Sequence, residues 1–381
     1  MSFSGVGNGS NIRALKVILI LYTFLIIGGS LSLYVLPQWS YLLNSDPAYA
    51  LTVIACACVA ILLSLGIAQL CADVASITVS RVGKIENVEW SVGHAIFVTA
   101  VAMVVLCGVL FQNFYLTYMP IAGLVIYMLL HRHNRAYLSH EWLREFFMLV
   151  TTITVSALIA PLVPIVFAIV AGMLTGRYRY ATIIATAYTA VLAIALVRLM
   201  AQGVNPVTVL FPGFTTFTVL ANGQLSLQYS LSSPSDVGNV LTKVFQFLVT
   251  NSYIAFLEEQ LGRATIPFVG PVLPTLLFVS LHVPSRVGIF FSPAFIASTV
   301  PEYAIVETVT IITMIAIAAI FLVRTYSLCG LIPSMLVHML YNTYIDTVAL
   351  NPVAAVVLIL VLFVLYLALR GVKILEGQQV D

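Results

Sequence analysis

Apolar stretches of about 17–25 residues recur along the chain, which is the length that an α-helix needs to cross a bilayer. They lie near 14–36, 48–72, 91–111, 114–130, 146–175, 180–201, 237–261, 266–283, 303–323, 330–349 and 351–370. Only 8% of the 381 residues are charged, against roughly 25% in a soluble domain. Because a backbone in lipid must satisfy its own hydrogen bonds, the pattern predicts an all-α, polytopic transmembrane bundle of about 11–12 helices.

Basic residues orient this bundle, since lysine and arginine concentrate in cytoplasmic linkers. Arg13 and Lys16 precede the first apolar stretch, and Arg370 and Lys373 follow the last. Both termini are therefore expected on the cytoplasmic side of the cell membrane. The first stretch is too long for the core of a signal peptide, so we expect a retained helix.

The stretch 146–175 is interrupted by Pro161 and Pro164, which break a regular helix. It predicts either one long kinked helix or two short ones. The charge pattern of the two halves of the chain agrees only if this stretch makes two passes and returns Arg177 and Arg179 to the cytoplasm. About thirty residues are too few for two full spans, so both alternatives stay open.

Residues 202–236 contain no lysine or arginine and resemble β-structure. Two runs, 215–220 and 225–229, flank Asn222-Gly223, a dipeptide typical of a hairpin turn. The pattern predicts a small extracytoplasmic β-hairpin, with an irregular loop as the alternative. The chain then divides into an N-terminal transmembrane module (1–201), this loop (202–236), a second transmembrane core (237–370) and a cytoplasmic tail (371–381).

Charged residues inside membrane spans are costly and need a reason. Glu258 and Glu259 are adjacent near the end of an apolar segment, and Arg263 follows Glu259 by four positions. On a helix this spacing places Glu259 and Arg263 on one face, in the favourable order. Glu258 points about 100° away without such a partner, which makes it the candidate proton acceptor.

Three further polar side chains lie in or beside neighbouring apolar segments. His282 ends the stretch 266–283, and His338 and Asn342 lie four positions apart within 330–349. That spacing puts His338 and Asn342 on one helical face. The residues predict either a reactive site with the glutamate pair or a hydrogen-bond network that joins helices.

These residues form three ordered patterns, each on its own apolar segment: Glu258-Glu259-x-x-x-Arg263, Phe278-x-x-x-His282 and His338-x-x-x-Asn342. The set resembles the CPBP family of membrane proteins, which includes type II CAAX prenyl proteases, bacteriocin-processing proteins and abortive-infection proteins. The family signature is EExxxR, FxxxH and HxxxN/D. The resemblance covers about residues 237–370 and does not extend to the N-terminal module.

The resemblance implies a glutamate-dependent intramembrane endopeptidase. By the family's pattern, Glu258 of this chain would activate a water with help from His282, while His338 and Asn342 would stabilise the oxyanion. This assignment is chemically sensible, because amide hydrolysis needs a base for the water and donors aimed at the developing negative charge.

The same resemblance assigns supporting roles. Glu259 would pair with Arg263 and hold the first pattern in place, and Phe278 would pack beside the helix that carries His282, with ordinary core or lipid contact as its alternative. The substrate would be a membrane-associated peptide or protein, prenylated or otherwise lipid-linked.

No cofactor is expected, with zinc as the minor alternative because two histidines and a glutamate can ligate it. The spacing is not HExxH, in which both histidines share one helix with the base. The cysteines Cys56, Cys58, Cys71, Cys107 and Cys329 lack metal-ligand spacing and are interpreted as buried small apolar side chains.

The net charge of +2 gives no reason to expect a nucleic-acid partner. A non-enzymatic protein remains the alternative to a peptidase, either a transporter or an immunity-type binding protein, because intramembrane Glu and His also form proton relays.

Overall fold

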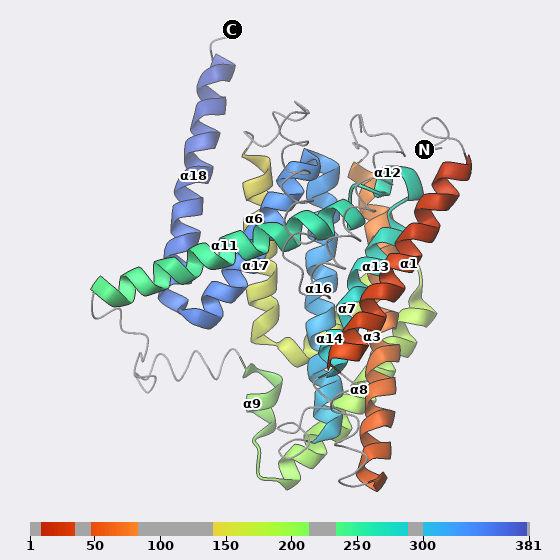
Figure 1. The fold of residues 1–381 in the computed structure, drawn as a ribbon. Coiled ribbons are helices and arrows are strands. Elements are labelled where there is room, and N and C mark those ends of the chain that lie inside the picture. Colours follow the sequence, from red (N-terminus) through yellow and green to blue (C-terminus); the bar gives the residue numbers. More distant parts are fainter. Residues whose placement is uncertain (1–8, 35–46, 83–139, 213–233, 289–299, 379–381) are drawn as a thin grey trace.

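The computed structural model describes residues 9–34, 47–82, 140–212, 234–288 and 300–378. Within these ranges the chain is helical and contains no strand, so the all-α prediction is confirmed for them (Figure 1). The hairpin strands expected at 215–229, and the apolar stretches 91–111 and 114–130, lie outside the described residues. The longer helices are α1 (Gly9–Tyr34), α3 (Pro47–Val82), α6 (Glu141–Leu158), α7 (Val163–Thr175), α8 (Tyr178–Ala201), α11 (Pro234–Gly262), α13 (Val272–Leu281), α16 (Pro301–Cys329), α17 (Leu331–Leu350) and α18 (Pro352–Gln378). The short ones are η2 (Ala160–Leu162), α9 (Pro206–Leu210), α12 (Ile266–Val269) and α14 (Val283–Val287).

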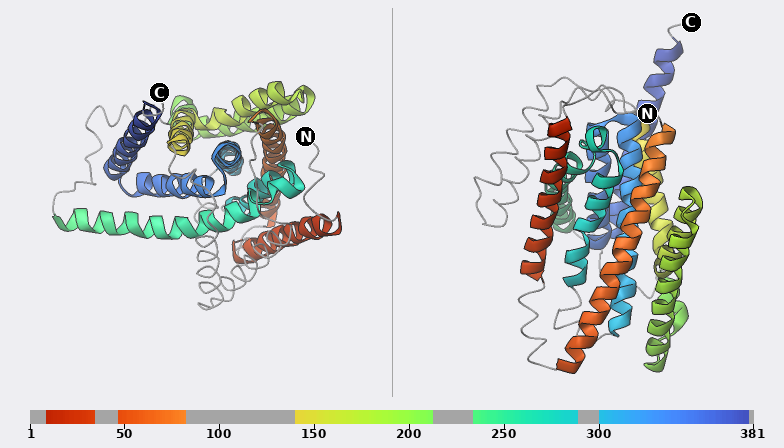
Figure 2. Two further views of the ribbon diagram at one scale, coloured as in Figure 1. Left: turned by 90° about the horizontal axis from the view of Figure 1, so that it is seen from above. Right: turned by 90° about the vertical axis from the view of Figure 1, so that its right-hand side faces the viewer.

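Six described helices are long and apolar enough to cross a membrane, as expected of a multi-pass membrane protein. They lie in α1, α3, α8, α11, α16 and α18. Of these, α11 differs in direction. It runs at a large angle to α16 in the side view, and it appears long in the view from above as well (Figures 1 and 2). Length and composition alone therefore do not show that α11 crosses the membrane alongside its neighbours.

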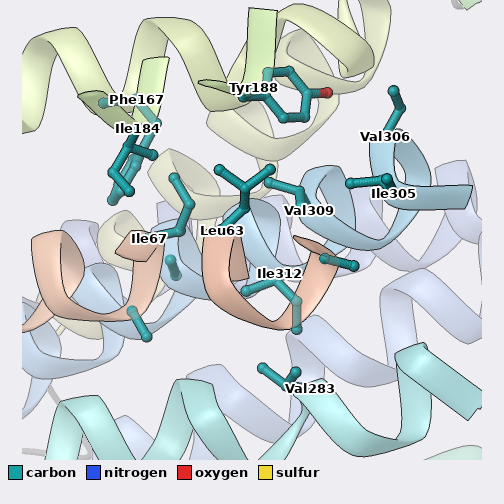
Figure 3. Packing of buried hydrophobic residues seen from close by; sticks show 14 of the residues in the cluster. Leu63, Ile67, Phe167, Ile184, Tyr188, Val283, Ile305, Val306, Val309 and Ile312 are labelled. Atoms are coloured by element: carbon teal, nitrogen blue, oxygen red, sulfur yellow. The ribbon is translucent and has the colours of Figure 1, made fainter. Parts of the chain in front are cut away.

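The packed core lies between α3 and α16, with α7, α8, α13 and α14 around them. Leu63 of α3 and Val309 and Ile312 of α16 point into it (Figure 3). Tyr188 of α8 is fully buried there, and its hydroxyl donates to the Pro161 carbonyl at 2.8 Å. The N-terminal module and the second transmembrane core thus pack into one bundle.

The stretch around Pro161 forms two short helices rather than one long kinked helix. α6 and α7 are separated by η2 and bent by 99°. Arg144, in the first turn of α6, and Leu174, at the end of α7, line the same cavity, so the pair leaves and returns to one end of the bundle. A return of this kind does not need two full spans. It therefore fits both the length of the stretch, about thirty residues, and the charge pattern.

A tight contact holds α7 against α8. The left-handed Gly176 (φ 72°) ends α7 and reverses the chain. Farther back, Gly172 lies so close to Ala181 that an added Cβ would lie 2.5 Å from the alanine Cβ. Small residues allow helix backbones to approach in this way in membranes.

The cysteines agree with their interpretation at three positions. Cys56, Cys71 and Cys329 are free and buried, and the Cys71 thiol donates to the Ala316 carbonyl at 3.2 Å. Cys58 is instead exposed, because it lies on the outer face of α3; the expectation of burial was wrong there. Cys107 lies outside the described residues.

Candidate functional site

Three helices bring the predicted residues together. Glu258 and Glu259 lie in the last turns of α11, His282 lies at the junction of α13 and α14, and His338 lies in α17. α13 ends early because Pro284 follows His282 and cannot continue the hydrogen-bond ladder. α11 packs along α17 and against α13, so one bundle region receives all four side chains.

Glu259 is the buried carboxylate of the pair, with no exposed side-chain surface. The Ser334 hydroxyl donates to its Oε2 at 2.6 Å, and His338 Nδ1 lies 2.9 Å from its Oε1. Arg263 adds an ion pair at 3.4 Å from the same oxygen. A carboxylate is stable in such a place only with partners of this kind, so Glu259 joins α11 to α17.

Glu258 is the accessible carboxylate, with 26% of its side chain exposed. Its Oε2 lies 3.4 Å from His338 Nε2, and its Oε1 lies 3.8 Å from His282 Nε2. Oε2 is itself buried and has no hydrogen-bond partner among the described residues. Glu258 therefore faces both imidazoles but is not saturated by either.

The protonated nitrogen of the neutral His282 ring follows from the partner of Nδ1. Nδ1 lies 2.8 Å from the carbonyl oxygen of Phe278, which only accepts hydrogen bonds. Nδ1 consequently donates, and in the neutral ring Nε2 presents a lone pair towards Glu258. Two acceptors then face each other 3.8 Å apart, with no proton between them for a direct hydrogen bond.

Phe278 lies at the centre of this arrangement and is buried. Its ring centroid is 5.1 Å from that of His282 and 5.9 Å from that of His338. The Arg263 guanidinium lies over the ring at 3.9 Å, within the range of a cation–π contact. Arg263 is almost fully buried, and its side-chain nitrogens lack hydrogen-bond partners among the described residues. The ring thus supports both histidines and the arginine.

Asn342 is not joined to the cluster by any side-chain hydrogen bond within the part of the chain that the structure describes. It is half-buried and lies one turn after His338 in α17, on the same helical face. The geometry places it beside the site without fixing the direction of its amide.

Two polar features escaped the sequence patterns. Ser334 lies one turn before His338 on the same face of α17, so the four-residue spacing was its available signal. Farther along α11 and α17, the Asn251 amide donates to Asp346 Oδ2 at 2.8 Å. This pairing depends on the packing of two helices far apart in the chain, and no local spacing predicts it.

The end of α11 and the end of α13 can meet at one site because α11 runs at a large angle to α16 and α13 is short (Figure 1). Ten residues of α13 rise only about 15 Å.

Among the described residues, no group of three or more His, Cys, Asp or Glu side chains is arranged to hold a metal ion. Comparison of the chain with known protein families, curated proteins and solved structures finds no match. The function is therefore argued from the site.

Proposed function

We propose that this protein is a membrane-embedded endopeptidase that hydrolyses a membrane-associated peptide with Glu258 as the general base. One observation carries the proposal: Glu258 faces the Nε2 atoms of His282 and His338 at 3.8 and 3.4 Å. Glu259 is instead held by Ser334, Arg263 and the other ring nitrogen of His338. Two adjacent carboxylates thus occupy different environments, as expected where one reacts and the other supports. The patterns that resemble the CPBP family support the same assignment.

The nucleophile would be a water between Glu258 and His282. A water about 2.8 Å from both atoms fits a separation of 3.8 Å. It would donate one proton to Glu258 Oε1 and the other to His282 Nε2, which orients its oxygen lone pairs towards a substrate carbonyl. As that oxygen attacks, Glu258 takes the proton, and it later delivers the proton to the leaving amine.

The negative charge of the tetrahedral intermediate needs donors. With protons on both ring nitrogens, His338 donates to Glu259 through Nδ1 and to the oxyanion through Nε2. The Glu259 carboxylate then balances the charge of the ring, much as a buried acid supports a catalytic histidine in a triad. Asn342 would supply a second donor from the next turn of α17.

The test is expression of wild type, Glu258→Gln, His282→Ala and His338→Ala in the native host without its own copy. Membrane proteomes are compared for peptides with a changed terminus. We expect a wild-type product that all three variants lack, although each accumulates in the membrane. Glu307→Gln is the matched control, because Glu307 is a carboxylate of membrane helix α16 outside the site. Full cleavage by a folded Glu258→Gln protein would overturn the proposal.

A transporter is the second candidate, favoured by the polar pairing beyond the site. Asn251 lies about two turns from Glu258, and Asp346 lies about two turns from His338, so polar groups extend along the contact of α11 and α17. Intramembrane carboxylates and histidines form proton relays in transporters. A proton flux across protein-containing vesicles that is lost in Asp346→Asn, with no proteolytic product, would favour this function.

A further inference from the structure

A second chemically distinct place lies at one end of the bundle, away from Glu258. A cavity of about 410 Å³ opens between α3, α6, α7 and α16. It shares no lining residue with the site described above. This volume falls within the range of small-molecule pockets, roughly 300–1,000 Å³.

Three arginines lie around this cavity: Arg81 of α3, Arg144 of α6 and Arg324 of α16. Arg144 and Arg324 share one buried carboxylate, Glu145, at 3.3 and 3.2 Å. Their side chains are nonetheless 45% and 37% exposed. Arg81 is exposed and makes no ion pair within the described part of the chain. The described residues that line the cavity thus include three arginines and no acidic side chain, and Glu145 pairs with two of these arginines.

The rest of the lining is largely apolar. Val74 of α3, Leu174 of α7, and Ile320, Phe321 and Leu328 of α16 provide most of it. A free phosphate would gain nothing from such surfaces, whereas a molecule with an anionic head and a hydrocarbon tail would gain from both parts.

The position of the arginines matches the level of lipid headgroups. Arg81 is the penultimate residue of the span Tyr49–Val82, Arg144 lies in the first turn of α6, and Arg324 lies near the end of the span Pro301–Cys329. Basic side chains at the ends of membrane helices lie at the headgroup boundary. Basic pockets between such helices bind anionic lipid heads.

We propose that this cavity binds an anionic phospholipid, with its phosphate among Arg81, Arg144 and Arg324 and part of an acyl chain against the apolar lining. Arginine suits this role because its planar guanidinium donates two parallel hydrogen bonds to phosphate oxygens. Glu145 fixes two of the three guanidinium groups, so the lipid would meet a preformed site and would brace α6 and α7 against α3 and α16.

Native mass spectrometry of the full-length protein in detergent tests the proposal, with titration of phosphatidylglycerol and phosphatidylcholine. The wild-type protein should retain phosphatidylglycerol in preference to phosphatidylcholine. Arg81→Gln should lower that retention about fivefold, the change expected for one arginine near an anionic lipid. Leu174→Trp, which fills the cavity from an exposed position and keeps every charge, should lower it as well.

Arg179→Gln is the matched control, because Arg179 is exposed at the start of α8 and does not line the cavity. It should bind phosphatidylglycerol as wild type does. Equal binding of the two lipids, or undiminished binding by both Arg81→Gln and Leu174→Trp, would overturn the proposal. Displacement of the lipid by an equal concentration of glycerol phosphate would show an anion site instead. None of these outcomes depends on peptidase activity.

Discussion

His338 Nδ1 lies 2.9 Å from Oε1 of Glu259, although the two residues are 79 positions apart in the chain. The contact joins α17 to α11 and sets the rotation of the imidazole. Nε2, on the opposite side of the ring, consequently points at Glu258, 3.4 Å away. A buried carboxylate therefore orients the histidine that faces the accessible one.

The two glutamates should respond differently to replacement by glutamine. Glu258→Gln removes the proposed base and should lower the rate of cleavage by at least about 100-fold, with little loss of stability because Glu258 is partly exposed. Glu259→Gln disrupts a buried charged cluster, and breaking such a pair costs about 3–5 kcal/mol. Thermal unfolding in detergent and a cleavage assay check both. Equal stability losses in the two variants would contradict the assignment.

Ser334→Ala tests whether the hydrogen bond that holds Glu259 in place also matters for cleavage. The variant loses the 2.6 Å hydrogen bond to Glu259, and we expect a stability loss of about 1–3 kcal/mol because a buried acceptor loses its donor. Ser327→Ala is the matched control, since Ser327 is equally buried but donates to the Val323 carbonyl within α16. Cleavage should fall in Ser334→Ala alone; similar activity in both would argue that Glu259 needs no such support.

The close approach of α7 and α8 predicts intolerance at Gly172. Gly172→Ala places a Cβ 2.5 Å from that of Ala181, and such overpacking costs about 1–3 kcal/mol. Gly238→Ala is the control, because Gly238 in α11 has open space around its Cβ position; it should be neutral or slightly stabilising, as alanine favours helices. Thermal unfolding midpoints of the two variants, measured in detergent, check this prediction. A stable Gly172→Ala protein would show that the helices separate easily.

Metal removal should leave activity unchanged under the proposed mechanism, since Glu258 and His282 activate the water themselves. Activity of the purified protein is measured before and after dialysis against EDTA and 1,10-phenanthroline, with elemental analysis of the same samples. Stoichiometric zinc, with activity lost on chelation and restored by zinc, would instead support the alternative in which Glu258, His282 and His338 are ligands.

Part of the site follows from local spacing. Glu259 and Arg263, like Phe278 and His282, are four positions apart on helices, and this spacing places each pair on one face. The unequal environments of Glu258 and Glu259 also follow from the position of Arg263. Ser334 was missed although it lies one turn before His338, because the spacing alone does not show that its hydroxyl meets Glu259 of another helix. The Asn251–Asp346 pair carries no local signal at all, since it depends on the packing of α11 against α17.

The apolar runs determined that the described chain is helical and suited to a membrane, because a backbone in lipid must pair its own polar groups within each segment. Tertiary packing decided what local periodicity does not encode. It set the large angle between α11 and α16, the return of α7 to the end where α6 begins, and the contact of His338 with both glutamates. Such contacts join residues far apart in the chain, and their geometry depends on how whole helices fit against one another.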